Sequence, residues 1–283
     1  MSRTGHSSSA LDLSKVESDL SQLITLDTSP DGRDHPAAVE WIRERLREMR
    51  FAVEVVQSSG TPLVVATRPA THDASGHVLL FGHYDVDHVE PGWNTPPFRL
   101  AQRDGRWYGL GIADNKGALA ARLTAVRTAE TCPRLTWIIQ GEEESGSRGL
   151  KAWLSATGLP SADWYLDENG WADDEGSQRI LACRVAHGQR VPLDEREAGV
   201  LVELLSGGWS KRHVEPRMLN KHLVPGGCVF QAALPEGARY LGIGTNDAMT
   251  QIHAPNESIP EYGVVRHIHG LVAFLGAVAR GDV

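Results

Sequence analysis

The chain of 283 residues is long enough for one large domain or two small ones. Hydrophobic residues make up 41% of it and charged residues 23%, which is typical of a folded globular protein and argues against disorder. The formal charge of −8, with no run of Lys or Arg, excludes the basic surface that nucleic acids or anionic membranes attract.

Features of the N-terminus and of the cysteines bear on the compartment. Residues 1–10 are polar and Ser-rich without the apolar core of a secretory signal, so we expect a disordered leader there. Cys132, Cys183 and Cys228 are widely spaced and form no C-x-x-C motif, which argues against a disulfide framework and a cysteine zinc site. A reducing, cytoplasmic location fits this pattern. No apolar run approaches the length of a membrane span.

Hydrophobic periodicity and turn residues predict alternating helices and strands. Helices are expected near residues 13–23, 39–49, 116–130, 149–156, 194–205 and 264–275, and strands at 52–56, 63–67, 78–81, 135–140, 164–166, 180–185 and 240–243. Asp194 followed by Glu197 resembles a capping box. The alternation indicates a single α/β domain over residues 11–283, with a mostly parallel or mixed sheet flanked by helices.

Side chains that bind metals follow several of the predicted strands. These are His83 and Asp85, then Glu142, Glu143 and Glu144, then Asp167 and Glu168, then Asn246, Asp247 and His253, with Asp114 just before a helix. In open α/β sheets, ligands bind beyond the carboxyl ends of the strands. Two histidines and three or more carboxylates suit zinc, with manganese or cobalt possible. Five ligands are more than one tetrahedral zinc ion can bind, so we expect two metal ions that share a carboxylate.

Six ordered motifs resemble the M20 metallopeptidases, which include carnosinase-like dipeptidases, carboxypeptidases, desuccinylases and aminoacylases. The motifs begin with Gly82-His83-Tyr84-Asp85-Val86, the Pro- and Trp-containing loop at 91–98, and Asp104-Gly105-Arg106-Trp107-Tyr108-Gly109. They continue with Asp114-Asn115-Lys116-Gly117, Glu143-Glu144-Ser145-Gly146-Ser147 and His253-Ala254-Pro255-Asn256-Glu257. The resemblance extends from about residue 11 to the C-terminus, and several motifs in the same order make it specific.

The resemblance implies a role for each matching residue. His83 and Asp167 would bind one metal, Glu144 and His253 the second, and Asp114 would bridge both. Asp85 would orient the His83 imidazole. Glu143 would be the general base, taking a proton from a metal-bound water and passing it to the leaving amine.

Each of these residues also has an ordinary structural explanation. His83 could be a surface histidine, Asp114 a helix N-cap, the three glutamates a solvated face and Asp167 a turn acid. The motifs favour the metal site because they occur together and in order. Asp247 and His269 are assigned to a surface turn and a helix face.

The chain departs from the family pattern in length. The resemblance implies a lid or dimerisation domain between the strand near residue 180 and the helix near residue 194, yet only residues 186–193 connect them, so we expect no lid. A monomer with an open cleft follows. The lid would normally supply an oxyanion donor, for which His187 or His213 is the candidate replacement, with Lys211 and Arg212 available to hold a substrate carboxylate. Leu110 stands where the family commonly has Arg.

The pattern therefore predicts a dinuclear zinc hydrolase of an amide bond in a small peptide or N-acyl amino acid, that is, a dipeptidase or deacylase. An alternative is a non-catalytic or regulatory metal-binding module that has lost the lid. A further alternative is a lidless aminopeptidase, in which Glu168, Asp173 and Asp174 would hold the free amine of the substrate.

Overall fold

The computed structural model describes residues 11–283 except 12, 58–59, 72, 169, 173–177, 207–212 and 216–227. The predicted leader, together with Lys211, Arg212, Asp173 and Asp174, lies outside the described residues. The elements in chain order are α1 (Ser14–Thr25), α2 (His35–Glu48), β1 (Ala52–Val56), β2 (Leu63–Arg68), β3 (His77–His83), β4 (Ala101–Arg103), β5 (Arg106–Tyr108), η1 (Ile112–Lys116), α3 (Gly117–Thr128), β6 (Arg134–Gln140), α4 (Arg148–Thr157), β7 (Trp164–Asp167), β8 (Arg179–Ala186), β9 (Gln189–Val191), α5 (Glu195–Ser206), β10 (His213–Glu215), α6 (Val229–Ala232), β11 (Arg239–Gly242), β12 (Ser258–Pro260) and α7 (Glu261–Arg280).

A large mixed sheet forms the centre of the protein, in the order β1-β2-β6-β3-β7-β11-β8-β10, with β9 paired to β8. Strands β6, β3, β7 and β11 are mutually parallel, whereas β2 runs antiparallel to β6 and β8 antiparallel to β11. The carboxyl ends of the four parallel strands therefore share one edge. This architecture confirms the predicted α/β class. A smaller sheet, β12-β5-β4, was not predicted.

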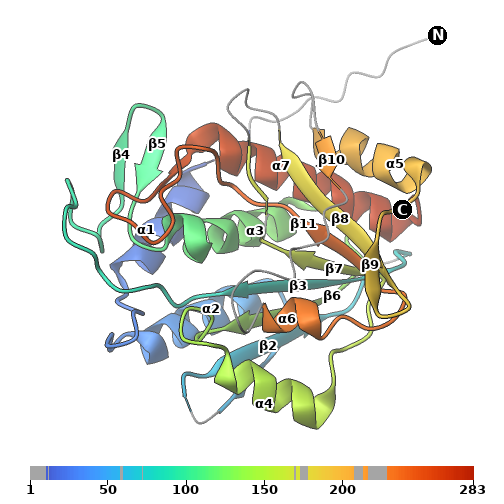
Figure 1. Cartoon of the computed structure of the whole chain (residues 1–283), viewed down its shortest axis with the longest axis horizontal. Coiled ribbons are helices and arrows are strands. Elements are labelled where there is room, and N and C mark those ends of the chain that lie inside the picture. The colour runs from blue at the N-terminus through green and yellow to red at the C-terminus, as the bar shows by residue number, and fades with distance from the viewer. Residues whose placement is uncertain are drawn as a thin grey trace.

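The alternation of side chains along the buried strands divides the core into two layers (Figure 1). On β3, Leu80 belongs to the core layer that contains buried residues of α1, α2, α3, α5 and α7, whereas Leu79 and Phe81 belong to the layer that contains residues of α4 and α6. Phe81 stacks on Phe230 of α6 with ring centroids 4.2 Å apart. Strands that are buried on both faces read as continuous apolar runs, which explains the sequence of β3.

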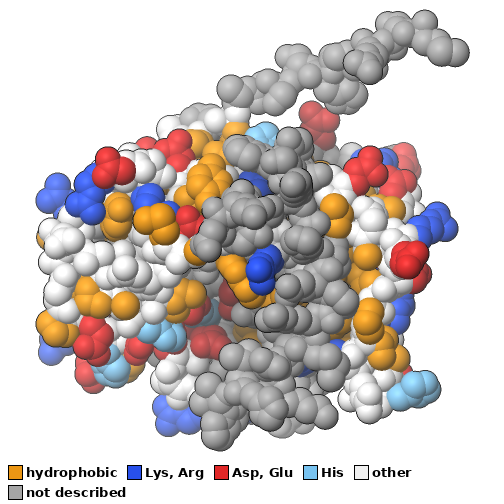
Figure 2. Space-filling model, turned by 45° about the horizontal axis from the view of Figure 1, so that its top comes forward, with side chains coloured by type: hydrophobic (Ala, Val, Ile, Leu, Met, Phe, Trp, Pro, Cys, Tyr) orange, Lys and Arg blue, Asp and Glu red, His pale blue; other side chains and the backbone are white. Residues whose placement is uncertain are grey.

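Helix α7 is long and apolar enough to cross a membrane, judged by length and composition alone. The sequence analysis expected no apolar segment of membrane-spanning length, and α7 corrects that expectation. However, 67% of its most apolar stretch is buried inside the protein, as in the core helix of a soluble domain. On the face shown in Figure 2, acidic and basic side chains of the described residues are interspersed.

Strands β8 and β9 form a tight antiparallel hairpin. The hairpin lies at the short connection of residues 186–193, where the family pattern would place the lid. Its turn consists of His187 and Gly188, both with positive φ (54° and 67°), as in the short turns that suit the twist of a hairpin. Helix α5 follows, and the Asp194 side chain accepts the Glu197 amide at 2.8 Å, which confirms the predicted cap. The absence of a lid stays a prediction, because residues 207–212 and 216–227 lie outside the described residues.

Candidate metal centre

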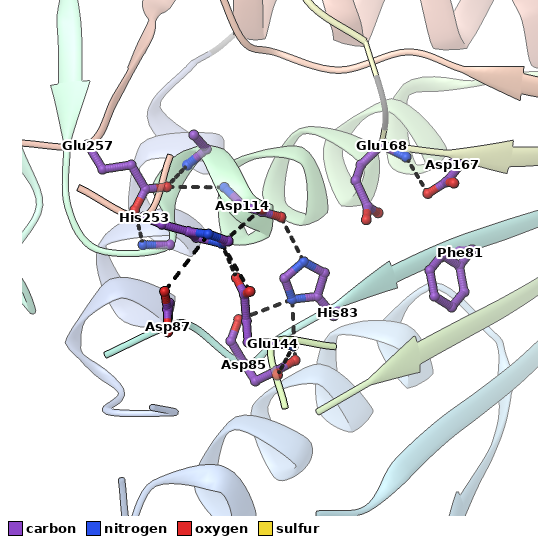
Figure 3. Close-up of polar contacts among 12 residues, drawn as sticks. Phe81, His83, Asp85, Asp87, Asp114, Glu144, Asp167, Glu168, His253 and Glu257 are labelled. Carbon is purple, nitrogen blue, oxygen red and sulfur yellow. Dashed lines mark hydrogen bonds and ion pairs between the residues drawn. The ribbon is translucent and has the colours of Figure 1, made fainter. Parts of the chain in front are cut away.

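Five segments bring metal-binding side chains to the carboxyl edge of the sheet (Figure 3). His83 is the last residue of β3, Glu144 follows β6, Glu168 follows β7, and His253 lies in the loop after β11. Asp114 lies in η1, immediately before α3. Because the four strands are parallel, their ends converge, as the sequence pattern predicts.

Asp114 lies between the two histidines. Its Oδ1 is 2.8 Å from His83 Nε2, and its Oδ2 is 3.6 Å from His253 Nε2. His253 Nε2 is also 3.0 Å from Glu144 Oε1. The ligand atoms offered by His83, Asp114 and Glu144 all lie within 4.8 Å of one another. This geometry brings together four of the five predicted ligands, with Asp114 in the bridging position.

Asp85 supports the cluster from below. Its Oδ1 is 3.3 Å from His83 Nδ1, and its backbone carbonyl is 3.1 Å from the same nitrogen. A partner on Nδ1 leaves Nε2 of His83 to face Asp114 as a ligand atom. Asp85 is buried, so this contact is shielded from water. Its position agrees with the orienting role that the resemblance implies.

The three consecutive glutamates have different surroundings. Glu142 is buried and accepts the Gly149 amide at 2.7 Å, so it secures the start of α4 rather than the metal cluster. Glu144 contacts His253 as described. Glu143 is half-buried beside the cluster, and burial raises the pKa of its carboxyl to about 7. The arrangement supports Glu144 as a ligand and Glu143 as a base.

Asp167, which was predicted as a ligand, points away from the cluster, whereas the next residue, Glu168, points toward it. Asp167 Oδ2 accepts hydrogen bonds from Gln231 Nε2 and Tyr240 Oη, each at 2.9 Å, and its Oδ1 accepts the Glu168 amide at 2.8 Å. Side chains alternate along β7, so Asp167 faces the same layer as Tyr165. Burial, followed by the charge of Asp167, raises the pKa of Glu168 well above its usual range.

The Glu168 carboxylate lies beside His83 and Asp114 in Figure 3. Its Oε2 is buried without a hydrogen-bond partner among the described residues. An orphaned carboxylate oxygen next to two imidazoles and two further carboxylates is the donor set that divalent zinc, manganese or cobalt prefers. The residues present therefore fit a metal pair. His83, Asp114 and Glu168 would hold one ion, and Asp114, Glu144 and His253 the other.

The two histidines proposed as oxyanion donors belong to different edges of the main sheet. His187 is in the β8–β9 turn, and because β8 runs antiparallel to β11, this turn lies at the opposite edge of the sheet. Its assignment is therefore corrected. The backbone of His213 pairs with Arg179 at the same edge as the cluster, but β10 is four strand positions from β3, or roughly 19 Å. The side chain of His213 lies outside the described part of the protein, so its role stays a prediction.

The sequence pattern predicts no role for Glu257, although the residue lies in the motif that begins at His253. Its buried carboxylate accepts the backbone amides of Gly111, Ala113 and Asp114 at 2.6, 2.7 and 3.1 Å. It thereby fixes the turn that presents Asp114, where Gly111 adopts a φ of 71°. A glutamate shortly after His253 gave no signal for this function, because its partners are backbone groups more than 140 residues away.

Asp247 also differs from the expected surface acid. Arg106 of β5 binds it in a bidentate ion pair, with Nη1–Oδ2 and Nη2–Oδ1 distances of 2.7 and 3.0 Å. The guanidinium also donates to Ser258 Oγ at 3.0 Å. This pair fastens the small sheet to the loop that carries His253. Its function is structural.

Comparison with known proteins identifies the family of the chain. The sequence model of the peptidase family M20/M25/M40 matches residues 79–280, and the chain belongs to that family. It is 32% identical to a cysteinylglycine-S-conjugate dipeptidase of Corynebacterium striatum over 145 residues, which cover 47% of this chain and 31% of that protein. It is 30% identical to a succinyl-diaminopimelate desuccinylase of Anaplasma marginale over 136 residues, 44% of this chain and 35% of that protein.

The matched stretches thus span about a third of each curated relative. Among solved structures, an M20 family metallo-carboxypeptidase from Sulfolobus solfataricus superposes with a TM-score of 0.68 at 16% identity, covering 95% of this chain and 100% of that chain. At this identity the likeness concerns the fold.

Proposed function

We propose that the protein hydrolyses an amide bond in a small peptide or an N-acyl amino acid, with two divalent metals per chain, zinc in the first place. One observation carries the proposal. Glu143 is a half-buried carboxylate whose pKa is raised to about 7, and it stands beside a cluster of two imidazoles and three carboxylates. The names of the two relatives, a dipeptidase and a desuccinylase, support a small amide substrate.

The chain's own residues would divide the work. His83, Asp114, Glu144, Glu168 and His253 would hold the metal pair, which when bound supplies Lewis acidity toward the scissile carbonyl and acidifies water. Glu143 would take a proton from the attacking water and deliver it to the leaving nitrogen, so that the amine departs neutral. Asp85 keeps the His83 ring in the orientation that points Nε2 into the cluster.

Two measurements test the proposal. After zinc supplementation, the purified protein is expected to retain close to two zinc ions per chain, and less than one would contradict it. A panel of dipeptides and N-acyl amino acids, assayed with zinc, cobalt and manganese, is expected to reveal a substrate. Bound metal with no turnover on the whole panel would favour the non-catalytic module instead.

We further propose a monomer in the cytoplasm. The support for the monomer is the tight β8–β9 hairpin at the position where the family's lid would begin, since that lid would carry the dimer surface. The support for a reducing compartment is that Cys132, Cys183 and Cys228 are all free thiols.

A further inference from the structure

Arg122 of α3 is a buried cation whose guanidinium reaches the ends of β3 and β11. Arg122 is only 1% exposed to solvent. Burying a guanidinium group is unfavourable unless its N–H donors form hydrogen bonds with acceptors. Nη1 donates to the backbone carbonyl of Phe81 at 2.6 Å, and Nη2 donates to that of Ile243 at 3.4 Å. Arg122 belongs neither to the proposed metal ligands nor to the proposed base.

These two carbonyls belong to strand ends that are not neighbours in the sheet. Phe81 is in β3, and Ile243 directly follows β11, while β7 lies between these two strands. The pairing of β3 with β7 ends at Leu80 and Leu166, and β7 itself ends at Asp167. The planar guanidinium therefore joins β3 to β11 where the strand between them has ended.

Each joined segment carries part of the metal cluster. His83 lies two residues beyond Phe81, and the segment after Ile243 leads to His253. Glu168, with its buried and unpartnered Oε2, leaves β7 between them. Metal sites need their ligands held to within about 0.5 Å, and the residues that support the ligands provide that precision.

We propose that Arg122 is a positioning residue of the metal pocket, which fixes the spacing of the ligands delivered by β3, β7 and β11. This inference rests on the proposed function. Two parallel donors in a rigid plane can bridge two carbonyls, whereas a lysine ammonium is a single point of charge on a flexible stem.

Cobalt titration tests the inference, because the visible absorption of Co²⁺ reports both its affinity and its coordination geometry. The full-length parent, Arg122→Lys and Arg122→Met are compared. Both variants are expected to bind cobalt at least about tenfold more weakly, with an altered spectrum, since losing a group that orients ligands typically weakens binding about 10- to 100-fold. Lysine retains the charge, so its failure to rescue would identify the bridge as the important feature.

Arg127 provides the matched control on the same helix. Its Nη2 is 2.8 Å from Asp19 Oδ2, in an ion pair between α3 and α1 that lies away from the cluster. Arg127→Lys and Arg127→Met are expected to lower the Tm while the cobalt affinity and spectrum stay those of the parent. If Arg122 only stabilised the fold, its variants would likewise show a lower Tm with the cobalt affinity and spectrum of the parent.

Arg122→Met is the second variant, because its unbranched apolar side chain fills much of the same buried space without placing a charge there. Parent-like cobalt affinity and spectrum in Arg122→Met would overturn the inference and leave the proposed function intact. Unfolding of both variants would also overturn it, since Arg122 would then serve the whole fold. A parent that binds no cobalt would overturn the proposed function and this inference together.

Discussion

The Asp85 carboxylate accepts the backbone amide of Glu144 at 3.0 Å while its other oxygen lies against the ring of His83. One buried side chain therefore holds a ligand on β3 and a ligand after β6. These two residues belong to different metal positions of the proposed pair. Movement at Asp85 would disturb both positions at once.

Asp85→Ala is accordingly expected to weaken zinc binding by about 10- to 100-fold, as for other groups that orient metal ligands. Competition with a chromophoric chelator measures the change. Asp163→Asn serves as the control, because Asp163 accepts the His77 amide at the opposite edge of the sheet. The zinc affinity of this control variant should match that of the parent. Equal affinities in Asp85→Ala and the control would contradict the orienting role.

Glu143→Gln is expected to reduce kcat by about 10²- to 10⁴-fold, since general base catalysis has that magnitude, while metal content is retained. Steady-state kinetics and metal analysis of the same preparation check both parts. Glu142→Gln is the neighbouring control. It should lower the Tm, because the Glu142 carboxylate caps the start of α4, but leave kcat/KM within a few-fold of the parent. Comparable activity losses in the two variants would argue against the assignment.

The correction at the end of β7 is directly testable. Glu168→Gln is expected to lower metal affinity or stoichiometry, because it removes a charged oxygen that faces the cluster. Asp167→Asn is expected to bind metal like the parent and to unfold at a lower temperature, because it disturbs the buried contacts to Gln231 and Tyr240. Isothermal titration with zinc, together with thermal unfolding, separates the two. The reverse pattern would restore Asp167 as the ligand.

The dependence of the rate on pH follows from Glu143. Burial raises the pKa of its carboxyl to about 7 in the metal-free protein, and nearby dications would lower it from there. A base acts only when ionised, so kcat/KM should be constant above that pKa and fall about tenfold per pH unit below it. Profiles from about pH 5 to about pH 9 test this. An acid limb centred well above pH 7 would point to a different titrating group.

Sedimentation at micromolar concentration is expected to give a mass near the 30.8 kDa of one chain. The physical reason is that an isologous dimer needs a self-complementary apolar surface, which in this family is expected on the lid. Zinc-loaded and zinc-free samples should behave alike. A concentration-independent dimer would show that another surface has taken over that function.

Local sequence patterns predicted most of the main elements, and four of the five residues predicted as ligands lie together in the structure. The strand at 52–56 has the predicted bounds, and Asp194 caps its helix as expected. These features depend on neighbouring residues, so the sequence expresses them directly. Three-residue strands such as β4 and β12 carry too few residues for a period to show, and they were missed.

The differences at Asp167 and His187 have two other causes. One additional residue in a strand turns a side chain to the other face, so the predicted end at residue 166 could not separate Asp167 from Glu168. His187 was misplaced because the direction of β8 in the sheet is a property of the whole topology. No local pattern states whether a strand runs parallel or antiparallel to partners far along the chain.

The fastening of the Asp114 turn by Glu257 also sets an order of events during synthesis. The ribosome adds about 5–20 residues per second, so the Asp114 turn leaves it many seconds before the carboxylate that holds its three amides. His253 emerges equally late. A growing chain therefore carries His83 and Asp114 without the partners that complete the pocket, and tight metal capture is deferred until the last quarter of the chain has been made.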